Sequence, residues 1–207
     1  EEEYGFRRNN SFDAVAQECR AVREAVGLTD LSSFAKYEVT GKDAFTFLER
    51  ICANRVPAKD GGVVLSQMLT TLGGIESEAT VTCLSPDHYY LLSGAVAELH
   101  DFDWFIQHIE EGEDVTVRNV TDDYGVLVIT GPQSRDVLSG LTHAGLTNED
   151  GFSWMSAREI SVAGIDVRAL RVSYVGELGW ELHCPMEKLS ELDDALMQAG
   201  MAHGIHR

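Results

Sequence analysis

The sequence lacks several features that would point to a nucleic-acid or membrane protein. Its 207 residues include 16 lysines and arginines against 34 aspartates and glutamates, and the formal net charge of −18 repels phosphate backbones and anionic headgroups. No long apolar run is present, so no membrane-spanning helix is expected. No basic and apolar leader opens the chain, so no signal peptide is expected. We therefore expect neither nucleic acid nor a membrane among the partners.

Cysteine is scarce, and no two cysteines form a CxxC pair. The four are scattered along the chain, at Cys19, Cys52, Cys83 and Cys184. Such spacing is typical of reduced thiols in a cytoplasmic protein rather than of a disulfide framework. Two of the seven histidines, His203 and His206, lie close together near the last residue, without a supporting cluster of cysteines or carboxylates. No metal site is therefore predicted.

The chain does contain an internal repeat. The segments "YEVTGKDAFTFLERI" (37–51) and "LVITGPQSRDVLSGL" (127–141) each read as an alternating strand that ends in Thr-Gly and is followed by a helix. Their glycines, Gly41 and Gly131, lie 90 residues apart, and further matches keep the same offset. A register that holds across most of a unit indicates a duplicated module.

Each copy is expected to run strand, helix, loop, two or three strands, then helix. This order predicts an α+β fold of split βαβ type, with helices on one face of a mainly antiparallel sheet. We assign residues 1–120 to the first module, together with an N-terminal helix, and residues 121–207 to the second. No linker rich in Pro, Gly or Ser separates them, so the modules are expected to share one tight interface.

Three helices are predicted from apolar residues at helical spacing, over residues 11–26, 97–110 and 187–199. Their apolar stripes are expected to be core rather than cofactor contacts. The stripes are Val15, Cys19, Val22 and Val26; Leu99, Phe102, Ile106 and Ile109; and Leu189, Leu192 and Leu196.

Two carboxylates stand out in predicted strands. The segment "RVSYVGELGWELHCP" (171–185) reads as two strands around a turn, and its alternation places Glu181 and His183 on one face. The 90-residue offset relates the region just before this segment to "LGGIESEATVTCL" (72–84), where Glu78 lies near the start of a strand. A carboxylate gains nothing from β-propensity, so each residue suggests either function or a solvated strand end.

The boundary between duplicated modules is a usual place for a ligand pocket. Carboxylates at such a boundary suit a flat hydrogen-bond donor, such as an aminopyrimidine ring, or a group that develops positive charge. Tyr174 and Trp154 provide aromatic side chains that pack well on a flat ring, although aromatic residues in strands are also common in cores. Residue spacing alone does not choose between these ligands.

Four segments carry a family resemblance: "SYVGELGWEL" (173–182), "GVLVITGPQSRDVL" (125–138), "VGLTDLSSFAKYEVTGKDAFTFL" (26–48) and "AELHDFDWF" (97–105). Together they resemble the folate-binding aminomethyltransferase family, which includes the glycine-cleavage T-protein and the C-terminal halves of dimethylglycine and sarcosine dehydrogenases. The motifs "LHDFDW" and "SYVGELGWEL" are most similar to those of the dimethylglycine dehydrogenase branch. The likeness covers nearly the whole chain.

The resemblance implies a tetrahydrofolate site between duplicated ferredoxin-like domains and a small C-terminal β-barrel. By this likeness Glu181 holds the ring N–H and exocyclic amine of the pterin, and Glu78 is the catalytic carboxylate. T-proteins carry aspartate at the latter place, whereas glutamate fits the dehydrogenase branch. The other positions that the likeness marks as folate contacts are Ala79, Thr80, Tyr174, Leu182 and His183.

The resemblance also implies a function. We expect a one-carbon transfer domain that accepts a methylene group from an iminium formed by oxidation of an N-methyl amine, such as dimethylglycine or sarcosine. A free-standing aminomethyltransferase, a folate-dependent demethylase and a non-catalytic folate-binding or assembly module stay open as alternatives. No G-x-G-x-x-G occurs, so FAD is expected only on a partner or missing flavin domain.

Because the chain stops at Arg207, directly after the last predicted helix, we also expect a fragment that lacks the barrel and is inactive alone. The expected compartment is the cytoplasm, or the mitochondrial matrix in a eukaryote.

Overall fold

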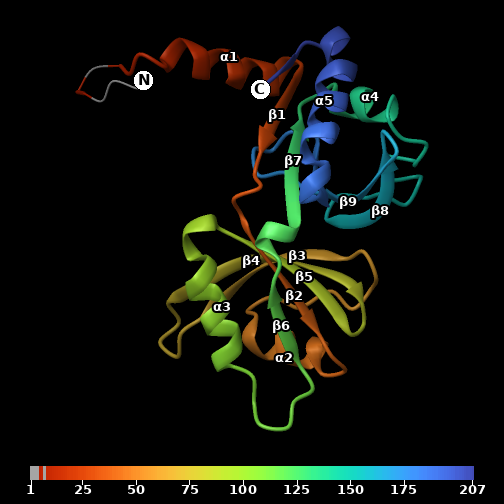
Figure 1. Cartoon of the computed structure of the whole chain (residues 1–207). Helices are drawn as coiled ribbons and strands as arrows, with labels where there is room; N and C mark the ends of the chain where they lie inside the picture. Colours follow the sequence, from red (N-terminus) through yellow and green to blue (C-terminus); the bar gives the residue numbers. More distant parts are fainter. Residues whose placement is uncertain (1–4, 7) are drawn as a thin grey trace.

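The computed structural model describes residues 5–6 and 8–207. In this part of the chain, two sheets are stacked one above the other (Figure 1). The strands are β1 (Val26–Asp30), β2 (Ala35–Thr40), β3 (Val63–Leu69), β4 (Ile75–Ser85), β5 (His88–Ser93), β6 (Thr116–Asn119), β7 (Tyr124–Thr130), β8 (Ser156–Val162), β9 (Ile165–Arg171), β10 (Gly179–Pro185) and β11 (Ile205–His206). The α-helices are α1 (Phe12–Glu24), α2 (Ala44–Ile51), α3 (Glu98–Gln107), α4 (Ser134–Ser139) and α5 (Leu189–Gly200).

The two sheets repeat one strand order. The lower sheet runs β3-β4-β5-β2-β6, and the upper sheet runs β8-β9-β10-β7-β1-β11. The first four strands of each list correspond. Along the chain, helices α2 and α3 follow β2 and β5 in the lower half, and helices α4 and α5 follow β7 and β10 in the upper half. The α+β class and the duplication are therefore confirmed. The four repeated strands pair antiparallel throughout, as the predicted mainly antiparallel sheet requires.

Each sheet has its own core on the face covered by its helices. The lower core contains Tyr37, Phe47, Leu91 and Phe105, all with no exposed surface. The upper core is built in the same way around Trp180 and other buried residues from β7, β9, β10 and α5. Because each sheet buries its apolar face under its own helices, the opposite face of each sheet is free to be more polar.

Strand β1 departs from the predicted division into residues 1–120 and 121–207. Although it precedes the whole first module, it pairs with β7 and β11 in the second sheet. It occupies the place next to β7 that β6 occupies next to β2. Sequence adjacency favours pairing with a neighbour along the chain, and here the long-range partner replaces it. Residues 1–4 and 7 of the predicted first module lie outside the described part of the chain.

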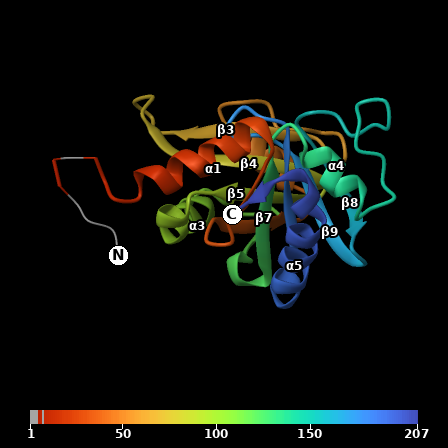
Figure 2. The same ribbon diagram turned by 90° about the horizontal axis from the view of Figure 1, so that it is seen from above.

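Helix α1 does not form core, which corrects the prediction for residues 11–26. Figures 1 and 2 show it reaching outward from the upper half of the molecule. None of its residues is buried; Val15 is 47% exposed, and Cys19 is also exposed. Val26 is buried, but in β1 rather than in the helix. The apolar stripe is present in the sequence, but no element in the described part of the chain buries it.

This placement gives a stability prediction for α1. Replacing Val15 with Ser should change the free energy of unfolding of this chain by less than about 0.5 kcal/mol, because exposed sites contribute little. Leu192→Ala in α5 is the matched comparison, since Leu192 is fully buried, and it should cost about 2–5 kcal/mol. Chemical denaturation of both variants provides the measurement. A loss of about 2 kcal/mol or more for Val15→Ser would show that the stripe packs against the body of the protein.

The predicted apolar stripe of α3 is partly confirmed, and that of α5 is fully confirmed. In α3 the buried residues are Asp101 and Phe105, whereas Leu99 and Ile106 are 74% and 43% exposed. The helix is therefore rotated relative to the predicted stripe, although Phe102 and Ile109 still pack against the core. In α5, Leu192 and Leu196 are fully buried, and Leu189 packs against the same core. No helix in the described residues has the length and apolar character needed to cross a bilayer.

Candidate functional site

The two sheets meet along their inner faces, and we call this surface the seam. It is defined by Tyr90 and Leu92 of β5, Val120, and the partly buried Phe34, Leu84 and Tyr124. Strand alternation decides which other side chains face it. Ala79 and Val81 of β4 belong to the lower core, so Glu78 and Thr80 point to the opposite, inner side. In β10, Trp180 and Leu182 belong to the upper core, so Glu181 and His183 point inward.

Glu181 and His183 lie together on the inner face of β10. His183 Nε2 is 3.3 Å from Glu181 Oε2, and the histidine and glutamate side chains are 0% and 14% exposed. The other ring nitrogen, Nδ1, is 3.0 Å from the hydroxyl of Tyr90 in the opposite sheet. Burial lowers the pKa of His183, and the positive charges of Arg168 and Lys36 act in the same direction, although Glu181 opposes them. His183 is therefore neutral at neutral pH.

Two cations with little exposed surface lie close to this group. The Arg168 guanidinium lies 4.5 Å from the ring centroid of Tyr90 and 5.3 Å from that of Tyr124, and its Nε donates to Glu159 at 2.8 Å. Lys36 of β2 is fully buried, and its Nζ donates to two backbone carbonyls, each at 2.8 Å. Burial lowers the pKa of Lys36 to about 8, against the opposing effect of nearby carboxylates. Each cation also has a carboxylate nearby, Glu159 for Arg168 and Asp122 for Lys36.

Glu78 lies on the inner face of the lower sheet but is more open to solvent. It is exposed, and Gln67 Nε2 of the neighbouring strand donates to its Oε2 at 2.5 Å. Thr80, the next inner residue along β4, is half-buried. No hydrogen bond or ion pair joins Glu78 to Glu181. The structure thus places both predicted carboxylates on facing surfaces without bringing them into contact.

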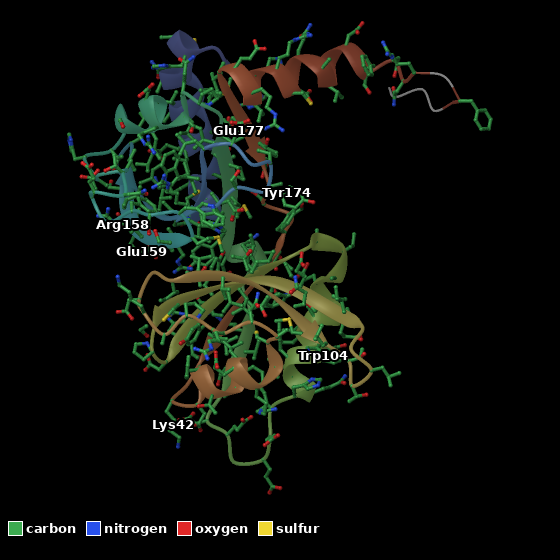
Figure 3. The ribbon with its side chains drawn as sticks, turned by 180° about the vertical axis from the view of Figure 1, so that it is seen from behind. Lys42, Trp104, Arg158, Glu159, Tyr174 and Glu177 are labelled. Carbon is green, nitrogen blue, oxygen red and sulfur yellow. The ribbon has the colours of Figure 1, made fainter. Side chains whose placement is uncertain are left out.

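The predicted aromatic residues lie beside the loop between β9 and β10. Tyr174 is fully exposed, and Figure 3 shows it projecting from this loop near the level where the two halves meet. Trp154 is 66% exposed and lines a hollow of about 340 Å³ with Arg171 and Glu177. Glu177 forms an ion pair with Arg23 of α1, which agrees with a structural role for this turn residue.

Two of the predicted folate contacts point away from the seam. Ala79 and Leu182 are 1% and 0% exposed and belong to the lower and upper cores, respectively. Their side chains therefore cannot reach a ligand at the seam, and only their backbone groups can.

A small hollow of about 100 Å³ lies at the seam, between Cys83 and Leu84 of β4 and Arg158, Glu159 and Arg168 of the upper sheet. Figure 3 shows Arg158 and Glu159 close to the lower half.

Sequence reasoning missed Tyr90, Arg168 and Lys36. Tyr90 follows a second tyrosine in "HYYLLS" (88–93), and strand alternation shows only that the two point to opposite faces. Which face meets the second sheet depends on how the modules dock. A lysine or arginine at alternating positions of a strand is normally a solvated residue. No local signal could therefore have identified these three.

The comparisons with known proteins agree with this architecture. The family model described as "GCVT N-terminal domain" matches residues 1–207. The chain belongs to this family. This GCVT N-terminal domain is 41% identical over 201 residues to human mitochondrial dimethylglycine dehydrogenase, covering 97% of this chain and 23% of that protein. It is 35% identical over 202 residues to an aminomethyltransferase of Chloroherpeton thalassium, covering 97% of this chain and 55% of that protein.

A solved structure also shows similarity to an aminomethyltransferase. The glycine cleavage system aminomethyltransferase T of Bartonella henselae superposes with a TM-score of 0.77 and 25% identity, covering 92% of this GCVT N-terminal domain and 49% of that chain. The predicted family resemblance is therefore confirmed. The domain spans about a quarter of the dimethylglycine dehydrogenases that it matches.

Proposed function

We propose that this GCVT N-terminal domain binds tetrahydrofolate at the seam and transfers a one-carbon unit to it. The observation that carries the proposal is the placement of Glu78 and Glu181 on the inner faces of two duplicated sheets, with the cations Arg168 and Lys36 near His183, the hydrogen-bond partner of Glu181. Relatives named aminomethyltransferase and dimethylglycine dehydrogenase support the same reaction class. Tetrahydrofolate supplies the nitrogen nucleophile that accepts the one-carbon unit.

The residues around Glu181 fit the edge of a pterin. The carboxylate is mostly buried on a strand, and one of its oxygens accepts from His183. The remaining lone pairs suit a ligand edge with two adjacent N–H donors, since charge-assisted bidentate bonds are both strong and directional. Tyr174, on the loop before β10, provides an exposed ring that can pack on the flat ligand. Thr80 lies on the facing sheet. Trp154 is proposed as a further aromatic contact.

Glu78 is proposed as the catalytic carboxylate. When a one-carbon unit moves from an iminium to an amine nitrogen, protons must leave the accepting nitrogens and reach the departing amine. An exposed carboxylate can take and return such a proton, and its charge stabilises a cationic centre. Gln67, which donates to Oε2, fixes the orientation of Glu78 while leaving its other oxygen free for this role.

This role predicts a specific kinetic effect for Glu78→Ala. Turnover should fall by about 100-fold or more, whereas the dissociation constant for tetrahydrofolate should change by less than about 3-fold. Glu76→Ala is the matched control, because Glu76 lies two residues earlier and contacts His100 of α3 at 2.9 Å; both of its constants should stay close to wild type. A large loss of affinity at unchanged turnover for Glu78→Ala would make Glu78 a binding residue only.

We further propose that the one-carbon donor is an iminium formed by oxidation of an N-methyl amine such as dimethylglycine or sarcosine. That oxidation needs a flavin, which we assign to a flavin oxidase or dehydrogenase domain outside this chain. The names of the dehydrogenase relatives support this assignment, and the same names include the word mitochondrial. The matrix is accordingly the proposed compartment in a eukaryote.

A second candidate is aminomethyl transfer by a free-standing aminomethyltransferase. The 35% identity to the Chloroherpeton thalassium protein favours it. The two candidates differ in the donor that supports methylene transfer. Incubating the full-length natural protein with tetrahydrofolate and either dimethylglycine or an aminomethylated carrier protein, and measuring methylene-tetrahydrofolate, distinguishes them. Absence of product with both donors would contradict both candidates.

A further inference from the structure

We propose that Tyr90 and His183 act as positioning residues for Glu181, through a hydrogen-bonded relay that crosses from the lower sheet to the upper one. This inference rests on the proposed function, in that Glu181 is taken to hold the ligand. It assigns a role to Tyr90, which lies in the other module, and it changes the role of His183 from a direct ligand contact to a residue that acts through Glu181.

Burial excludes a direct contact for His183. Its side chain has no exposed surface, whereas Glu181, two residues earlier on the same face, is 14% exposed. A ligand that approaches along the seam therefore meets the carboxylate first. His183 lies behind it, between Glu181 and Tyr90.

The chemistry of the three groups fixes the direction of the relay. An ionised carboxylate can only accept hydrogen bonds, so the proton between Nε2 and Glu181 belongs to His183. Because the buried imidazole is neutral, Nδ1 carries no proton and must accept a hydrogen bond from the Tyr90 hydroxyl, 3.0 Å away. Each of the two hydrogen bonds in the relay thus has a defined donor and acceptor. A hydrogen bond from a neutral donor leaves the negative charge on Glu181 available to the ligand.

The start of the relay is itself held in place. The Tyr90 and His183 rings meet edge to face, with centroids 5.4 Å apart and planes at 85°. The Arg168 guanidinium lies over the Tyr90 ring, and Tyr124 packs against its edge with the centroids 5.8 Å apart. Because Tyr90 comes from β5 and Glu181 from β10, the orientation of the carboxylate depends on the docking of the two modules.

Tetrahydrofolate titrations of the full-length natural protein test the relay. His183→Phe keeps a ring but removes both hydrogen-bonding nitrogens. It should weaken binding by about 10-fold or more, because hydrogen bonds to charged groups are strong. Tyr90→Phe should weaken it by about 3-fold to 10-fold. His183→Gln keeps an N–H donor at the reach of Nε2 and should restore affinity to within about 3-fold of wild type. The double variant Tyr90→Phe/His183→Phe should bind no more weakly than His183→Phe alone.

Tyr89→Phe is the matched control. Tyr89 is the adjacent tyrosine, is equally buried, and its hydroxyl donates to the backbone oxygen of Pro57 at 3.2 Å, on the opposite side of the sheet. It should lose thermal stability comparable to that lost by Tyr90→Phe but keep wild-type affinity. Equal affinities for the Tyr89 and Tyr90 variants, or a His183→Gln variant that binds no better than His183→Phe, would overturn the relay.

Two further measurements separate this inference from the proposed function. Glu181→Gln that binds tetrahydrofolate as tightly as wild type would contradict the proposed function itself. Nitrogen NMR of histidine-labelled protein tests the relay without ligand: His183 should be neutral with its proton on Nε2, and Tyr90→Phe should reduce this preference. A proton on Nδ1, or a charged ring at neutral pH, would overturn the relay.

Discussion

Replacing Gly41 or Gly131 with alanine should destabilise the chain by about 3 kcal/mol or more in each case. Both glycines adopt nearly the same left-handed backbone, with φ of +125° and +124°, which residues other than glycine rarely adopt. A Cβ atom at Gly41 would lie 2.0 Å from the backbone oxygen of Asp114, and one at Gly131 would lie 2.5 Å from that of Ala25. These oxygens belong to backbone just before β6 and β1, so neither can move without displacing a strand.

Gly112→Ala separates the effect of the positive φ from the effect of the steric clash with a neighbouring backbone oxygen. Gly112 also has a positive φ, +90°, but a Cβ atom added there would meet no described atom within 4 Å, so this variant should lose only about 1–2 kcal/mol from backbone strain. Thermal unfolding should show a decrease of about 6 °C or more for the Gly41 and Gly131 variants and a smaller one for Gly112→Ala. Equal decreases in all three would show that the close approach to β1 and β6 adds nothing.

The second large effect is expected at the proposed ligand site. Glu181→Gln should weaken tetrahydrofolate binding by about 2–4 kcal/mol, because a buried carboxylate that accepts two donors is replaced by an amide that presents one donor to them. The fold should be unaffected, since the amide oxygen can still accept from His183. Calorimetric titration of the full-length natural protein measures the change. Glu177→Gln is the control from the same motif, and its ion pair with Arg23 predicts an affinity close to wild type.

Local patterns were sufficient to predict the repeat and the orientation of Glu181. The Thr-Gly corner occurs twice at an offset of 90 residues, and the two copies have the same backbone geometry. Alternation in β10 correctly placed Glu181 and His183 on one face and Trp180 and Leu182 on the other. Both features depend only on residues that are close in sequence.

Features that depend on docking could not be predicted in the same way. β1 has no local property that selects β7 over β2, yet it pairs with β7. The apolar stripe of α1 has the same spacing as a buried one, but none of its residues in the helix is buried. Tyr90 gains its importance only because the inner face of β5 meets β10 in the folded chain. In each case the deciding contact joins residues that are distant in sequence.

The most direct test of the seam as the ligand site is a crystal structure of the full-length natural protein with tetrahydrofolate bound. The account predicts the pterin between the inner faces of the two sheets, with its ring N–H and exocyclic amine within hydrogen-bond distance of Glu181 and its reactive nitrogens toward Glu78. A pterin bound away from the two inner faces, with Glu181 free of ligand, would contradict it.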